Sequence, residues 1–378
     1  MTRQAEFKRR VRARMAKTGE SYTTARSSLL ASRPGAAPDG SPLDWMREAL
    51  HVSNGDATDV PGTGLARRVV YWRDVLHEGP VPEAPPAELR RIRARHLTGY
   101  EGVEHAAVLR RLTERDRALE AHRDGEYVLW FEADLYDQLQ LVDILARLAG
   151  LAVPAGRVTL ICIGEHPGIA RFGGLGELTA EQLRELPRTN ACSRLTPAAF
   201  DLATRAWTAF RAPTPEGLAA VAAARLGELR FLGEAFDRLG REYPSTRDGL
   251  SLTERRVLSA VADGAPDAGT AFARAGARET RPYMGDVTCF DRMYRMARGP
   301  HPLLRLDPPG GPVRRTTRVR LTATGARVLA GEAGQVTLNG VDRWIGGVHL
   351  RGHRVPWRWD DGVEAVVRVT GGASASPA

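Results

Sequence analysis

A chain of 378 residues, 43% of them apolar, is long enough for two or three domains with sizeable cores. It has no run of about 18 apolar residues and no apolar segment behind its basic N-terminus, which argues against a transmembrane helix and a secretory signal. We therefore expect a cytoplasmic protein with no membrane partner. Its three cysteines are too widely spaced for a disulfide framework or a zinc motif.

The net charge of +9 is distributed unevenly along the chain. Residues 1–33 carry nine basic and two acidic residues (+7), residues 34–246 carry 25 and 30 (−5), and residues 247–331 carry 15 and 8 (+7). Two basic segments thus flank an acidic body. This pattern favours a polyanion such as DNA at those two segments rather than at the middle of the chain.

Residues 1–33 are predicted to form a basic helical hairpin, whose first helix covers residues 6–17. Two interpretations apply to this hairpin: a contact with DNA, or an accessory element whose charges are solvated. Residues 34–43, which are rich in Pro, Gly, Ser and Ala, are predicted to be a linker.

Residues 44–178 have the pattern of an α/β domain. Four short apolar runs are expected to be strands, at residues 49–53, 68–72, 127–131 and 157–163. Helical patterns follow the second and third runs. Because strands alternate with helices, we expect a mostly parallel sheet.

Polar side chains follow each of the four predicted strands. The carboxyl ends of parallel strands meet at one edge of a sheet, where ligands of such sheets bind. We therefore expect one crevice lined by Asp56, His77, Glu78, Glu132, Asp134 and Glu165. Four further candidates for ligand binding at this edge are His51, Asn54, Arg73 and Asp137.

These residue types indicate phosphoester chemistry as one interpretation. His77 beside Glu78 has the pattern of a general base with a carboxylate neighbour. Glu132 and Asp134, together with Asp56, offer oxygen ligands to a hard divalent cation, and an arginine such as Arg73 can pair with a phosphate. The candidate catalytic residues are His77, Glu78, Glu132 and Asp134. The sequence does not identify the metal. The alternative to this interpretation is that the same residues have structural roles.

In the structural alternative, Asp134 and Asp137 cap the helix that follows the third strand. Histidines next to turns, such as His51 and His77, are then hydrogen-bonded structural residues. Glu132 comes too early in the chain to cap that helix, so this alternative leaves one member of the acidic group unexplained.

Residues 179–246 are predicted to form a helical layer, and residues 247–331 have the pattern of a winged helix. The third helix of this region is expected at residues 286–298, with two wing strands at 302–306 and 318–322. Helical spacing predicts an outward face that carries the candidate groove readers Thr288, Arg292 and Arg295. The candidate phosphate contacts on the wing are Arg314, Arg315 and Arg318.

Residues 332–362 are predicted to be a β-rich tail that packs on the core, and residues 363–378 are predicted to be disordered. The expected fold class is therefore α/β: a mostly parallel sheet domain with a helical layer, then a winged-helix domain and a short β tail.

Several of these runs together resemble a bacterial family catalogued only as a domain of unknown function. The resemblance rests on His51 to Asp56, Trp72 to Pro80, Phe131 to Gln140 and, in the second half, Arg281 to Asp286 and Asn339 to Leu350. It covers residues 49 to about 360. Because the family brings no known activity, the resemblance implies boundaries but no role.

Two functions of different classes fit these observations, and a third explains part of them. The first is a DNA-associated protein that responds to a small molecule or nucleotide bound by its α/β domain. The second is a metal-dependent enzyme that acts on a nucleotide or phosphoester. The third is a protein-interaction module whose acidic body docks a basic partner. The residues alone do not decide whether the protein is an enzyme.

Overall fold

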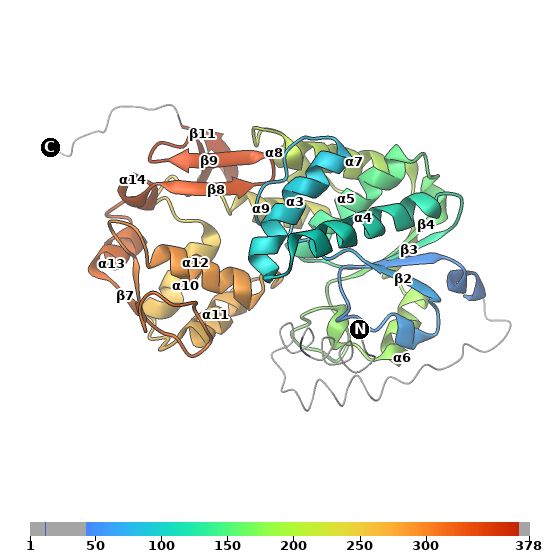
Figure 1. The fold of residues 1–378 in the computed structure, drawn as a ribbon, viewed down its shortest axis with the longest axis horizontal. Coiled ribbons are helices and arrows are strands. Elements are labelled where there is room, and N and C mark those ends of the chain that lie inside the picture. The colour runs from blue at the N-terminus through green and yellow to red at the C-terminus, as the bar shows by residue number, and fades with distance from the viewer. Residues whose placement is uncertain (1–11, 13–42, 370–378) are drawn as a thin grey trace. The chain divides into compact units, whose positions relative to one another are not determined.

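The computed structural model describes Arg12 and residues 43–369. The predicted basic hairpin, apart from Arg12, and nearly all of the predicted linker therefore lie outside the described residues. The chain divides into two compact units, and Figure 1 shows the elements of both. Unit 1 comprises Met1–His77, Glu83–Thr208 and Ala223–Ala235, and unit 2 comprises Glu78–Pro82, Ala209–Ala222 and Phe236–Ala378.

A five-stranded sheet forms the centre of unit 1. It consists of β1 (Leu50–Ser53), β2 (Arg68–Tyr71), β3 (Tyr127–Glu132), β4 (Val158–Ile163) and β5 (Cys192–Arg194). The first four strands, which the sequence predicted, are parallel to their neighbours, whereas β5 pairs antiparallel with β4. The sheet is therefore mixed, because a short strand of three residues closes one edge.

The strand order is β2-β1-β3-β4-β5. The chain leaves β1 for β2 on one side and later returns to place β3 on the other side of β1, so the order reverses between β1 and β3. Leu50 lies opposite Tyr127, and Ser53 lies opposite Trp130. The loops that follow β1 and β3 therefore begin next to each other at the carboxyl edge of the sheet.

Helices cover both faces of this sheet, which explains why β3 and β4 are mostly apolar and fully buried. Trp130 of β3 packs in one cluster with Leu183 of α6 (Ala180–Glu185). The opposite face carries α3 (Pro86–Glu101), α4 (His105–Ala121) and α5 (Leu135–Gly150), and Figure 1 shows α6 and α4 on opposite sides of the strands.

Short helical turns and three further helices complete the connections. The 3-10 turns are η1 (Asp44–Arg47), η2 (Pro61–Thr63), η3 (Ala155–Arg157), η4 (Leu175–Glu177) and η5 (Leu186–Arg188). The helices are α7 (Pro197–Arg211), α8 (Leu218–Ala222) and α9 (Leu232–Gly240). The boundary between the units falls within α7 and α9, so the residues of the predicted helical layer are divided between the two units.

Unit 2 contains three helices followed by a β-hairpin and a fourth helix. These are α10 (Leu252–Ala262), α11 (Ala268–Ala277), α12 (Asp286–Met296), the strands β6 (Leu304–Asp307) and β7 (Arg318–Leu321), and α13 (Ala323–Ala330). One apolar cluster includes Val257 of α10, Met293 of α12 and Val319 of β7. An isolated bridge also pairs Asp267, just before α11, with Arg318 of β7.

The face that α12 exposes differs from the predicted one. Thr288 and Arg292 are only 3% and 4% exposed, so the prediction that they lie on an outward face is wrong. Val287, by contrast, is 53% exposed. The helix is buried over a wider arc than a simple amphipathic surface helix, because it contacts further parts of unit 2 besides α10 and α11.

The C-terminal tail belongs to unit 2. It contains α14 (Gln335–Asn339), the hairpin of β8 (Val341–Ile345) and β9 (Val348–Gly352), and the pair β10 (Trp357–Asp360) and β11 (Ala365–Arg368). The prediction of disorder from residue 363 is therefore wrong for the residues of β11.

Two glycines fix the turn of the β8–β9 hairpin. The N–H of Val81 donates to the carbonyl of Gly346 at 2.8 Å, and the N–H of Gly347 donates to the carbonyl of Phe210 at 2.9 Å. A Cβ atom on Gly346 would lie 2.0 Å from the Phe210 oxygen, and the residue has φ 58°, so both space and backbone conformation require glycine. The hairpin turn is thereby anchored within unit 2.

None of the helices in the part of the chain that the structure describes is both long enough and apolar enough to cross a membrane. All three cysteines are free, with Cys162 and Cys289 buried and Cys192 partly buried.

Candidate functional site

The candidate site lies at the carboxyl edge of the sheet in unit 1, at the point where the strand order reverses. Asn54 and Asp56 follow β1, and Glu132, Asp134 and Asp137 come from the end of β3 and the start of α5. Because β1 and β3 are neighbours, the prediction that these residues share one edge agrees with the strand order. Such reversal points are where open α/β sheets bind ligands.

Asp137 connects the two loops. Its Oδ1 accepts a hydrogen bond of 2.6 Å from the side-chain amide of Asn54, and its Oδ2 accepts one of 2.6 Å from the N–H of Glu132. The side chain is fully buried. Burial raises the pKa of the nearby Cys162 thiol, and the negative charge of Asp137 raises it further. Asp137 thus places a buried carboxylate between the ends of β1 and β3.

Glu132 is held by the loop that follows β4. Its Oε1 accepts a hydrogen bond of 2.8 Å from the N–H of Leu175. Gly174 has φ 135°, and a Cβ atom there would lie 2.1 Å from Glu132 Oε2, so glycine is needed for the loop to reach the carboxylate. The loop of residues 173–176, which is rich in glycine, thus uses its Leu175 N–H to bind a protein carboxylate.

Asp134 is the N-cap of α5, as the structural alternative expected. Its Oδ1 accepts a hydrogen bond of 3.0 Å from the N–H of Asp137. Asp134 also lies close to two other carboxylates. One carboxylate oxygen from each of Glu132, Asp134 and Asp137 lies within 4.8 Å of the other two. All three residues are buried. We call these three residues the carboxylate trio.

Asp56, which follows β1, and Arg73, which follows β2, form an ion pair. Arg73 Nη2 lies 3.0 Å from Asp56 Oδ2, and the Arg73 N–H donates to the carbonyl of Asn54 at 3.0 Å. Arg73 adopts φ 42°, a conformation that few non-glycine residues take. The group of carboxylates close enough to share a cation differs from the set expected from sequence, because Asp137, and not Asp56, lies with Glu132 and Asp134.

His51 has a structural role. Its Nε2 lies 2.8 Å from the carbonyl of Met46, and its Nδ1 accepts from the indole N–H of Trp130 at 2.9 Å. Burial lowers the pKa of His51 to about 4, although hydrogen bonds to the Met46 and Leu65 carbonyls act in the opposite direction. Both ring nitrogens are occupied by the protein, so the expectation that His51 contacts a ligand is wrong.

The remaining predicted residues of this edge have different surroundings. The ring of His77 packs edge-on against Tyr136, in the first turn of α5, with centroids 5.8 Å apart. Glu165 is exposed after β4. The carboxylate of Glu78 forms an ion pair with Arg292 inside unit 2, and its predicted role as the partner of His77 stays a prediction.

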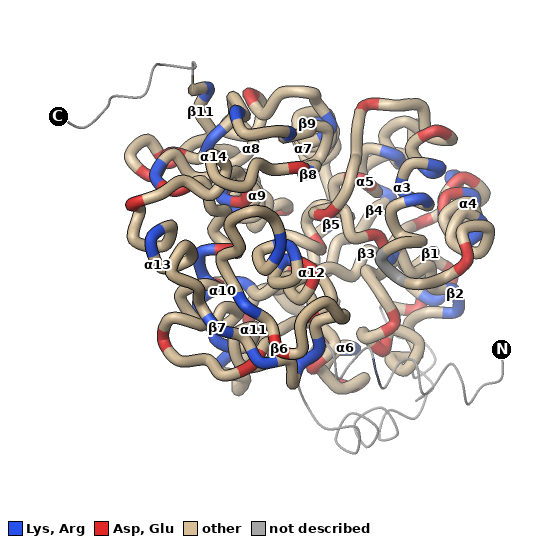
Figure 2. The backbone as a smooth tube through the Cα atoms, turned by 60° about the vertical axis from the view of Figure 1, so that its left-hand side comes forward, with Lys and Arg blue, Asp and Glu red and all other residues tan. Residues whose placement is uncertain are grey.

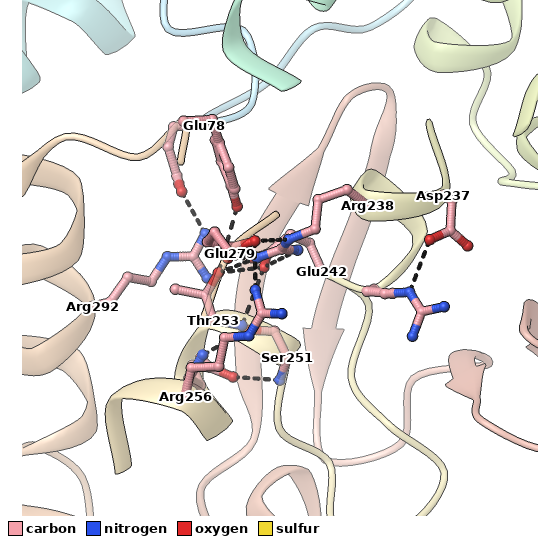
Figure 3. Close-up of polar contacts among 12 residues, drawn as sticks. Glu78, Asp237, Arg238, Glu242, Ser251, Thr253, Arg256, Glu279 and Arg292 are labelled. Atoms are coloured by element: carbon pink, nitrogen blue, oxygen red, sulfur yellow. Dashed lines mark hydrogen bonds and ion pairs between the residues drawn. The ribbon is translucent and has the colours of Figure 1, made fainter. Parts of the chain in front are cut away.

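A buried ionic cluster around Glu242 in unit 2 was not predicted from the sequence (Figure 3). Glu242 Oε1 accepts from Arg238 at 3.0 Å and from the Thr253 hydroxyl at 2.5 Å, and Oε2 accepts from Arg343 at 2.6 Å. Arg292 lies 3.5 Å from the same Oε2. Although burial alone would raise it, these arginines hold the pKa of Glu242 well below its usual value.

This cluster explains why α12 is buried where the sequence predicted an exposed face. Arg292 forms ion pairs with Glu78 and Glu242, and both glutamates lie far from it in sequence. Of the three predicted groove readers, Arg295 alone is exposed, at 65%, and it pairs with Asp291 at 2.8 Å. The predicted wing residues Arg314, Arg315 and Arg318 are exposed, and Arg315 pairs with Asp286 at 3.1 Å.

No protein-family model matches this chain, and no curated protein matches it. The resemblance to a family of unknown function therefore stays a prediction, and the role of the site follows from its geometry.

Proposed function

We propose that unit 1 binds a small phosphorylated ligand, such as a nucleotide, through a divalent cation held by the carboxylate trio. The observation that carries this proposal is the approach of three buried carboxylate oxygens to within 4.8 Å of one another. Their position at the reversal of strand order supports it independently, because ligands of open α/β sheets bind at that point.

The chemistry of the trio suits a hard cation. Mg²⁺ and Ca²⁺ take oxygen ligands, and carboxylates are their usual protein ligands. The amide of Asn54 and the backbone N–H of Leu175 each hold a trio carboxylate in place. Hydrogen bonds of this kind orient metal ligands. Arg73, fixed beside Asp56, is suited to pair with a phosphate of the ligand.

The second half of the proposal is that unit 2 associates with DNA in response to this ligand. Support comes from the order of its elements, α10, the bridge at Asp267, α11, α12 and the β6–β7 hairpin, which resembles the order expected of a winged helix. Groove reading by α12 is not favoured, because Thr288 and Arg292 are buried. In this proposal, unit 2 therefore binds DNA through its positive charge and not through recognition of bases.

The test of the ligand proposal is cation binding by the full chain. We expect the protein, stripped with a chelator, to bind one Mn²⁺ per chain by isothermal titration calorimetry, and to bind a nucleoside triphosphate more tightly with Mn²⁺ than without it. Glu165→Gln is the matched control, since Glu165 is an exposed carboxylate after the neighbouring strand and lies outside the trio. Absence of binding at millimolar Mn²⁺ would contradict the proposal.

A second candidate is hydrolysis of the phosphoester, favoured by the contact of the His77 ring with Tyr136, the residue that precedes Asp137 in α5. In this reaction water attacks phosphorus, His77 accepts the proton of the water, and the P–O bond to the alcohol breaks. Steady-state release of 4-nitrophenol from bis(4-nitrophenyl) phosphate with Mn²⁺ tests it. His77→Gln should abolish turnover but leave Mn²⁺ affinity unchanged; turnover that persists in this variant excludes His77 as the base.

A further inference from the structure

We propose that the exposed face of the β6–β7 hairpin binds the phosphate backbone of duplex DNA through Arg305, Arg318 and Arg320. This inference rests on the proposed DNA association of unit 2 but not on the carboxylate trio. Two of its residues, Arg305 and Arg320, were not among the candidates that the sequence suggested. It places DNA association on a surface other than α12.

The pairing of the two strands brings the arginines together. Arg305 lies directly opposite Arg320, and Asp307 lies opposite Arg318. Burial alternates along both strands, so that Leu304, Leu306 and Val319 face the core while all three arginines face outward. Figure 2 shows basic positions, in blue, near β6 and β7.

The hairpin carries much more positive than negative charge. Residues 304–321 contain five arginines and one aspartate, a net charge of +4. Like charges directly opposite each other destabilise an antiparallel pair. The side chains of Arg305, Arg318 and Arg320 form no ion pair or hydrogen bond with any described residue. A face that is electrostatically unfavourable by itself is stabilised when an anionic partner binds across it.

The composition of the hairpin favours duplex nucleic acid over other anionic partners. Single-stranded nucleic acid is held by aromatic side chains on which bases stack, and residues 304–321 contain no aromatic residue. Membrane surfaces are held by basic residues together with apolar residues that insert, and none of the large hydrophobic residues exposed in the described chain lies in the hairpin. A duplex backbone requires only an array of cations.

The test compares the full chain with the double variant Arg305→Thr/Arg320→Thr, which keeps residues suited to strands. Fluorescence anisotropy measures binding to a labelled duplex of arbitrary sequence over a series of salt concentrations. We expect the slope of log affinity against log salt to shrink by about 1.8, from roughly 0.9 for each of two lost phosphate contacts. The matched control is Arg351→Thr/Arg368→Thr, which removes two exposed strand arginines elsewhere in unit 2 and should leave the slope unchanged.

Stability provides the second readout. Because the variant relieves a like-charge pair, its melting temperature should equal or exceed that of the parent, so a weaker slope cannot be attributed to unfolding. A parent chain that does not bind the duplex would contradict the proposed DNA association itself. If the parent binds, an unchanged slope or an equal loss of slope in the control variant would overturn the assignment to this hairpin. Anionic vesicles that bind as tightly as the duplex, and lose binding in the same variant, would overturn the assignment to DNA.

Discussion

The carboxylate trio of unit 1 and the Glu242 cluster of unit 2 are both buried and acidic, but they are built from different partners. Around Glu242 the partners are the arginines Arg238, Arg292 and Arg343. In the trio, the hydrogen bonds described above come from amides: the Asn54 side chain and the backbone N–H groups of Glu132, Asp137 and Leu175.

This difference separates a structural cluster from a candidate binding site. Arginines neutralise a buried carboxylate and tie the elements that carry them together, which for Glu242 are α9, α12 and β8. Amides orient a carboxylate without adding a positive charge of their own. Carboxylate oxygens are the usual protein ligands of divalent cations, so the group held by amides is the candidate for cation binding. Each prediction below changes one side of this comparison.

The largest effect is expected for Glu242→Ala. Glu242 is 2% exposed, and its removal leaves Arg238, Arg292 and Arg343 buried without the carboxylate they share. Breaking one partner out of a buried ion pair costs about 3–5 kcal/mol. Urea denaturation should show this loss. Glu332→Gln, at an exposed pair with Arg327, is the control and should change stability by less than about 1 kcal/mol.

The same cluster predicts a pH dependence in strongly acidic solution. The pKa of Glu242 is well below its usual value in the folded chain, so its stabilising contribution is complete above the unfolded pKa and is lost as the pH falls through the folded one. The stability of unit 2 should therefore fall with acid in the parent and fall less steeply in Glu242→Gln. If the free energy of unfolding falls equally steeply with acid in the two proteins, the Glu242 ion pairs do not contribute to this pH dependence.

The next largest effect concerns His51 and acts at milder pH. His51 is fully buried, and its pKa is lowered from 6.5 to about 4 in the folded chain. A shift of this size corresponds to about 3 kcal/mol. The contribution of His51 to stability is complete above pH 6.5 and is lost as the pH falls towards 4. The reason is that the unfolded chain takes up the proton more readily than the folded chain. Urea denaturation between these pH values measures it, and His51→Gln should flatten the dependence.

A smaller effect is expected for Asp137→Asn. One oxygen of Asp137 accepts from the Asn54 amide and the other from the Glu132 N–H, so either orientation of a new amide group places a donor against a donor. An unsatisfied buried group costs about 1–3 kcal/mol. Urea denaturation measures it, with Glu185→Gln at an exposed pair as the control. A loss no larger than that of the control would mean that Asp137 does not hold the two loops together.

The sequence predicted the parts of this molecule that depend on local pattern. The four parallel strands were found because short apolar runs are bounded by polar turns, and the placement of Asn54, Asp56, Glu132 and Asp134 at strand ends followed from that. The order β2-β1-β3 could not be read from the runs themselves, since it depends on which strands pair. Nor could β5, because three residues carry too little periodicity.

The error on α12 has a different cause. Arg292 is buried because Glu78 and Glu242, which lie far away in sequence, bind it, and helical spacing contains no trace of either. One local signal did exist: Cys289 and Met296 lie three residues before and four after Arg292, which places this arginine on an apolar face. Sequence patterns thus placed side chains at element ends better than they identified their partners.

The smallest effect on stability, and the sharpest test of the comparison, is expected for Asp134→Asn. Asparagine caps helices about as well as aspartate, so the N-cap bond to the Asp137 N–H is kept and the melting temperature should change little. If the trio holds a divalent cation, the variant loses one anionic ligand, and Mn²⁺ affinity should fall about tenfold or more, the lower end of what removal of an interaction with a charged group costs. Metal content and melting temperature measured on the same preparation separate the two roles. An unaltered Mn²⁺ affinity would leave Asp134 as a helix cap alone, and the trio would then belong with the Glu242 cluster as structure.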